Sequence, residues 1–182
     1  MNTRKILLVI SLISLSNTAI ADVLSITVGG GLWNATPDGN FNKVTDPNSV
    51  DVKDDLFLDT ESQGYAFITI EHFVPIIPSI RVMYTDNSYA GNGASSFTFD
   101  GQTFTGNVVS DIKMTNLDLL AYYEVLDNIV SLDIGLNIRQ LSIDYTIIST
   151  ASTTTDSFNE TFPMLYALAG VSPWPDFLLV LK

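Results

Sequence analysis

The chain has 182 residues, with 20 Asp and Glu against 8 Lys and Arg, 46% hydrophobic residues, one His and no Cys. A formal net charge of −12 repels polyanions, and there is no basic run, so we expect no nucleic-acid partner. The absence of Cys excludes disulfide scaffolds, Cys-based zinc sites and thiol catalysis. A single His excludes a multi-histidine metal site.

The first 21 residues have the pattern of a signal peptide. Arg4 and Lys5 are followed by an apolar stretch, 6–15, and by the A-x-A cleavage pattern Ala19-Ile20-Ala21. We therefore expect a removed signal peptide, 1–21, and one mature domain, 22–182. No later apolar run is long enough for a membrane helix, which leaves a periplasmic protein or an outer-membrane β-barrel.

Several stretches of the mature chain alternate between apolar and polar residues. Residues 130–139 place five aliphatic side chains on one parity and only polar residues or Gly on the other. A helix would place Asp133 and Arg139 inside the apolar stripe, whereas a strand separates the two sets. The same pattern occurs in 24–32, 64–74, 79–86 and 113–125. These stretches predict an all-β, antiparallel fold.

The connections between the predicted strands differ in length. Short, Pro- or Asn-containing turns are expected at 75–78, 126–128 and 172–175, and long polar loops at 34–55, 87–111 and 149–156. Short turns at one end and long loops at the other are typical of an outer-membrane barrel. Alternation alone does not separate this fold from a soluble β-sandwich or a lipocalin-like binding protein, because both pair an apolar face with a polar one.

Ionisable residues of both signs on the polar parity favour the barrel, whose lumen they would line. The charged lumen candidates are Glu71, Arg81, Asp118, Glu124, Asp133 and Arg139. We expect ion pairs between Glu71 and Arg81, which flank one tight turn, and between Asp133 and Arg139 on one strand face. Aromatic residues near strand ends suit interfacial girdles. They are Trp33, Tyr65, Phe67, Phe73, Tyr84, Tyr122, Tyr123, Tyr166 and Trp174.

Three segments carry a family resemblance: Gly29-Gly30-Gly31, the turn Glu71-His72-Phe73-Val74-Pro75 with Pro78-Ser79-Ile80-Arg81, and the hairpin from Tyr122-Tyr123-Glu124 through Leu126-Asp127-Asn128 to Ser131-Leu132-Asp133-Ile134-Gly135-Leu136. The chain resembles, as far as Val171, an uncharacterised family of small outer-membrane β-barrel proteins of Gram-negative bacteria. Members are broadly similar to the OmpW and OmpX type.

The resemblance implies an up-and-down transmembrane barrel of the eight-stranded type, ending in a hairpin with a terminal aromatic residue. This chain instead stops at Lys182, with about six to seven strands. Bacterial single-chain barrels have an even number of strands, since an unpaired edge is costly in lipid. We therefore expect a C-terminally truncated chain; closure by fewer strands or by association of subunits is the alternative.

No residue set predicts catalysis, and we expect neither an enzyme nor a cofactor. His72 has the lipid-facing parity of Ile68 and Ile70 and is interpreted as an interfacial residue. The acidic stretch 46–61 is interpreted as a solvated loop; the alternative is a Ca²⁺ or Mg²⁺ bridge to lipopolysaccharide. The expected function is a structural or surface role in the outer membrane. Expected partners are membrane lipid, lipopolysaccharide and the barrel-assembly machinery. A narrow conduit for small or hydrophobic solutes is the alternative within the same membrane.

Overall fold

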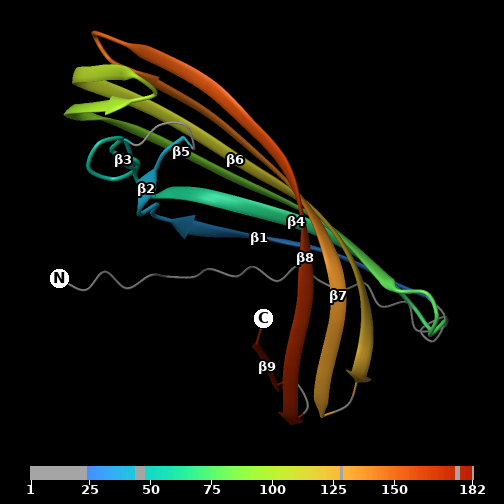
Figure 1. Ribbon diagram of the computed structural model, residues 1–182. Helices are drawn as coiled ribbons and strands as arrows, with labels where there is room; N and C mark the ends of the chain where they lie inside the picture. The colour runs from blue at the N-terminus through green and yellow to red at the C-terminus, as the bar shows by residue number, and fades with distance from the viewer. Residues whose placement is uncertain (1–23, 44–47, 128, 175–176, 182) are drawn as a thin grey trace.

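A computed structural model of the chain describes residues 24–43, 48–127, 129–174 and 177–181 (Figure 1). The expected signal peptide lies outside these residues. The described part contains strands and no helix. The strands are β1 (Leu24–Ala35), β2 (Asn40–Phe41), β3 (Val50–Asp51), β4 (Glu61–His72), β5 (Ser79–Phe99), β6 (Gln102–Asp127), β7 (Val130–Ile148), β8 (Thr153–Trp174) and β9 (Phe177–Leu181).

Seven strands form one antiparallel sheet in the order β1-β4-β5-β6-β7-β8-β9, and β2 pairs with β3 in a separate small ribbon. The all-β, antiparallel prediction is therefore confirmed. The sheet is long and strongly curved (Figure 1). Within the described residues, β1 pairs with β4 alone and β9 with β8 alone, so the two edges do not meet. None of the described residues forms a helix of the length and hydrophobicity needed to cross a membrane.

The predicted long loop at 87–111 is wrong, because these residues continue strands β5 and β6. The two strands pair without interruption from Ser79 and Tyr122 to Phe99 and Gln102. Asp100 and Gly101 form the turn, with φ values of 53° and 69°. Positive φ at both central residues is the requirement of a tight type I′ hairpin turn, which Asp-Gly meets at low cost. The connection between β7 and β8 is also short, so only 36–60 is a long connection among the three predicted.

The polarity of the two sheet faces inverts along the strands. On β6, the convex face carries Leu117, Leu119 and Val125 in one half and Thr103 and Thr105 in the other. Paired residues share a face, and the same inversion follows the pairing from strand to strand. The apolar half of the convex face, here called the apolar band, comprises the convex-facing residues within 24–32, 64–70, 80–84, 117–125, 130–138 and 163–171.

A continuous row of polar residues marks the upper limit of the apolar band. Three cross-strand pairs make up this row, and each pair lies diagonally, two residues out of register, from the next. They are Asn34, Ser62, Asp86, Thr115, Gln140 and Thr161. Above the row the convex face is mostly polar, with the paired residues Val109 and Ile148 as apolar exceptions. A single level therefore separates two chemically different parts of the sheet.

Above this row, the concave face holds the main hydrophobic cluster, here called the upper core. The described parts of the long connection, 36–43 and 48–60, fold over the concave face there (Figure 1) and add their own apolar side chains. Leu58 forms a bridge to Gly91 of β5, and the Asp59 amide donates a hydrogen bond to the Ala90 carbonyl. The buried members are Val50, Leu56, Leu58, Phe99, Phe104, Val108, Tyr145 and Ile147.

Replacing Phe99 tests the upper core. Phe99 is fully buried, so Phe99→Ala should lower the free energy of opening of residues 48–60 by about 3 kcal/mol through the cavity it leaves. Amide hydrogen exchange measures this opening. Thr98→Ala, one residue away on the exposed convex face, should change it by less than about 0.5 kcal/mol. Equal effects of the two variants would contradict the assignment of the faces.

Candidate functional site

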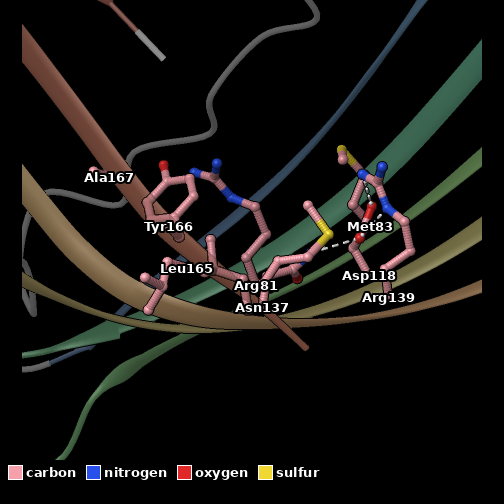
Figure 2. A pocket seen from close by; sticks show the side chains of 10 residues that line it. Arg81, Met83, Asp118, Asn137, Arg139, Leu165, Tyr166 and Ala167 are labelled. Carbon is pink, nitrogen blue, oxygen red and sulfur yellow. Dashed lines mark hydrogen bonds and ion pairs between the residues drawn. The ribbon is translucent and has the colours of Figure 1, made fainter. Parts of the chain in front are cut away.

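The six charged candidates lie on β4 to β7, on the parity that faces the concave side below the upper core. Asp118 is almost fully buried, whereas Glu71, Arg81, Asp133 and Arg139 are half-buried and Glu124 is exposed. Figure 2 shows Arg81, Asp118 and Arg139 rising from the concave surface of the curved sheet. The sequence pattern therefore groups these residues on one face, but the strand register determines which of them touch.

Asp118 is the centre of a polar cluster on this face. It pairs across β6 and β7 with Arg139, whose Nε and Nη2 donate to Oδ1 at 2.8 Å and Oδ2 at 2.9 Å. The Asn137 amide donates to Asp118 Oδ1 at 2.7 Å. A two-pronged Arg–carboxylate bond is stronger and more directional than a single contact. The cluster joins side chains of β6 and β7 on the concave face (Figure 2).

The expected pair of Asp133 with Arg139 is wrong. Asp133 and Arg139 are six positions apart on β7. Their Cα atoms are therefore about 20 Å apart, because each residue advances an extended strand by about 3.3 Å. Arg139 instead binds its cross-strand neighbour Asp118. The register places Asp133 opposite Glu124 and Leu168.

Glu71 and Arg81 also have other partners than expected. Arg81 Nε donates to Thr69 Oγ1 at 2.8 Å, directly across the β4–β5 pair. The Glu71 carboxylate accepts a hydrogen bond of 2.6 Å from the Tyr122 hydroxyl. The Arg81 guanidinium carbon lies 5.2 Å from the ring centre of Phe67 and 5.9 Å from that of Tyr122, within cation–π range. Tyr122 therefore contacts both charged residues, which do not form an ion pair in the described structure.

Much of the predicted aromatic girdle lies on the concave face instead of the convex one. Stacked or tilted ring contacts join Trp33 to Tyr65, Tyr65 to Phe67 and Tyr122 to Tyr166, with centroid distances of 5.9, 6.3 and 6.2 Å. The girdle prediction is wrong for these five residues because their parity points inward. Three other girdle candidates are exposed and do not belong to this group: Phe73, Tyr84 and Tyr123. The side chain of Trp174 lies outside the described residues.

Two glycines of β1 make room for these rings. A Cβ added to Gly29 would meet the Phe67 ring at about 2.5 Å, and one added to Gly31 would meet the Tyr65 ring at 2.7 Å. Both distances are shorter than real Cβ contacts, so any side chain at either position would displace a ring. The glycine repeat of the first strand thus serves the packing of the concave face.

A hollow of about 230 Å³ opens between the two arginines of this face. Its apolar wall contains Met83, Leu120 and Met164, and its polar groups come from Arg81, Asp118, Asn137, Arg139 and Tyr166. In Figure 2 the guanidinium end of Arg81 lies beside the Tyr166 ring, and the Asp118–Arg139 pair lies beyond Met83. This hollow is the candidate functional site. Its lining combines apolar and polar side chains.

Lys43 closes the far end of the concave face. Its Nζ lies 2.7 Å from a carboxylate oxygen of Asp100, at the β5–β6 turn, and 2.7 Å from one of Asp156 on β8. The Lys43 bond is the main cause that lowers the pKa of Asp156 below 3.8. The same two carboxylates raise the pKa of Lys43. The Lys43 ammonium group therefore links the connection between β1 and β4 to the β5–β6 turn and to β8.

Several polar residues in and around the site were not among the six charged candidates: Asn137 lines the hollow, Thr69 and Tyr122 contact the charged residues, and Lys43 lies at the far end of the concave face. Thr69 and Asn137 are polar residues at inward-facing positions of predicted strands, so their parity was a usable signal. No local pattern predicts the partners of Lys43, because Asp100 and Asp156 are brought to it by the fold. His72 lies on the convex side, paired with Leu24, away from the hollow.

Comparison of the chain with protein-family models, with curated proteins and with solved structures gave no match.

A double-mutant cycle tests the Asp118–Arg139 pair. Asp118→Ala should destabilise the folded protein by about 3 kcal/mol, because it leaves a half-buried guanidinium without its partner. The coupling energy of Asp118→Ala with Arg139→Ala should be about 2 kcal/mol, measured by urea unfolding in micelles. The exposed pair Lys113–Asp86, separated by 3.7 Å, is the control and should couple by less than about 1 kcal/mol. Equal coupling would contradict a special role for the buried pair.

The Lys43 contacts predict an acid-sensitive upper core. The pKa of Asp156 is lower in the folded than in the unfolded chain. The ionised carboxylate of Asp156 therefore stabilises the folded state above pH 3.8, and this stabilisation is lost as the pH falls below that value. Hydrogen-exchange protection of residues 48–60 should therefore decrease below about pH 4. Lys43→Gln should reduce protection at pH 7 and flatten this part of the profile. An unchanged profile in Lys43→Gln would show that the acid response arises elsewhere.

Proposed function

We propose that the protein is a small integral outer-membrane β-barrel protein with a structural or surface role and no catalytic activity. The observation that carries this proposal is the inversion of sheet polarity. In the apolar band, aliphatic side chains cover the convex face while charged and polar ones fill the concave face. An outer-membrane barrel requires this arrangement, with an apolar exterior towards lipid and a polar interior.

The exposed aliphatic surface is too extensive for a water-facing sheet. Leu32, Leu136 and Leu165 are 63%, 62% and 89% exposed. Exposed members of the band occur on all six long strands. Soluble proteins rarely expose a contiguous apolar patch larger than a few hundred Å². Lipid contact accounts for the surface without requiring a partner protein.

The height of the apolar band also fits a bilayer. On β1, β6, β7 and β8 it extends over about nine residues, the length that a tilted strand needs to cross the hydrocarbon core. Above the band, the apolar residues move to the concave face and form the upper core, as expected for a part of the sheet that stands in water. The predicted signal peptide and the resemblance to small outer-membrane barrels support the same location.

The two other functions fit the concave face less well. A lipocalin-like binding protein has an apolar interior, whereas this concave face carries Arg81, Asp118 and Arg139 at the level of the band. A conduit would need an open lumen, but aromatic rings and the Asp118 cluster occupy the concave face, and 36–60 folds over its upper end. Steady single-channel conductance in planar bilayers would favour the conduit over the structural role.

Arginine substitutions along the convex face of one strand test the membrane location. Leu119→Arg, within the band, should destabilise the protein in lipid bilayers by about 2–4 kcal/mol, whereas Asn107→Arg, on the same face above the band, should cost about 0–1 kcal/mol. Denaturant unfolding from liposomes measures both. Equal costs at the two positions would contradict the proposal.

A further inference from the structure

Arg81 differs from Arg139 in its partners, although both face the same hollow. Arg139 is neutralised by the two oxygens of Asp118. Arg81 contacts the hydroxyl groups of Thr69 and Tyr166 and two aromatic rings, and no ion pair joins it to a carboxylate among the described residues. Glu71, the nearest candidate in sequence, is engaged by Tyr122. Within the described part of the chain, Arg81 therefore has no ion-pair partner in direct contact, unlike Arg139.

An arginine at the level of a bilayer core is costly unless a counter-charge is present, and such residues commonly mark functional sites. The guanidinium is held in place, because Thr69 binds its Nε and the rings of Phe67 and Tyr122 lie beneath it. A fixed guanidinium donates two parallel hydrogen bonds to a carboxylate or a phosphate. The chemistry of Arg81 thus selects an anionic group.

The rest of the hollow is suited to a short hydrocarbon chain. Met83, Leu120 and Met164 line it next to Arg81, and Leu120 is buried. Its volume of about 230 Å³ lies below the roughly 300–1,000 Å³ of pockets for drug-sized ligands. A ligand that fits would have a small anionic head and a limited number of methylene groups inside the hollow.

We propose that the hollow beside Arg81 binds the anionic head of an amphiphile, a carboxylate or phosphate attached to an alkyl chain, with Arg81 as the residue that binds the head. The inference rests on the proposed function, because the membrane level of Arg81 makes its missing counter-charge costly. The amphiphile has two sources, a free short-chain fatty acid or an anionic membrane lipid, and both present the same chemistry.

The test uses the full chain in nonionic micelles and carboxyl-¹³C octanoate as the NMR probe. Octanoate should bind more tightly than 1-octanol, which lacks the charge, and than acetate, which lacks the chain. Arg81→Gln should weaken octanoate binding at least about tenfold, since a charge-assisted hydrogen bond is lost. Arg81→Lys should restore part of the affinity. Lys113→Gln, which removes a positive charge from the exposed convex face, should leave binding unchanged.

The outcomes separate this inference from the proposed function. Boiling-sensitive migration on a gel first shows whether each variant is a folded barrel; its absence in the unmodified chain would contradict the proposed function. A folded chain that binds octanoate no better than 1-octanol, or equally in Arg81→Gln, would overturn the anion site alone. Competition by phosphatidylglycerol would assign the site to a lipid, and lack of competition would assign it to a free amphiphile. Both of these results support the proposal.

Discussion

In the proposed membrane location, the structure depends on one constraint: a strand that passes from one solvent into another must exchange its apolar and polar faces. The long strands keep their register through the row from Asn34 to Thr161, so the side-chain parity does not change there. The sequence changes instead, and aliphatic residues move from the convex to the concave face. If the whole sheet stood in water, the apolar band of the convex face would be exposed to it. The proposed membrane location, with lipid below the row and water above it, removes this conflict.

The same constraint explains why the two halves of the concave face are held together differently. Above the row, where the proposed location places the sheet in water, segments 36–43 and 48–60 complete an apolar core with Phe99, Phe104 and Ile147. Below the row, the apolar surface faces outward, so the concave face is stabilised by hydrogen bonds, ion pairs and aromatic contacts. Hydrogen bonds there are stronger than in water because the local dielectric constant is lower, and an unpaired charge is correspondingly costly. This cost makes Arg81, which has no ion pair among the described residues, the residue of this face that calls for an anionic partner.

Much of the fold could be predicted from the sequence, because alternation in residues 130–139 and in the first strand fixes parity without knowledge of the partner strands. Pairing was less accessible: Arg139 was expected with Asp133, but its partner Asp118 is set by the β6–β7 register. The extension of β5 and β6 was missed because Gly91, Gly93 and Ser95 interrupt the apolar parity just where the faces invert. Asp100-Gly101 between the apolar positions Phe99 and Phe104 was a usable hairpin signal. The contacts of the central site form between strands. The sequence could therefore predict which residues share its face, but not which of them touch.

The most direct test of the face inversion is the solvent accessibility of nitroxide labels along the convex face of β6 in lipid bilayers. Labels at Leu117, Leu119 and Ala121 should collide with oxygen, which concentrates in lipid, and should be protected from a water-soluble nickel complex. Labels at Thr103, Thr105 and Lys113 should show the reverse, with the change between Thr115 and Leu117. A uniform accessibility to the nickel complex along the whole strand would contradict the account.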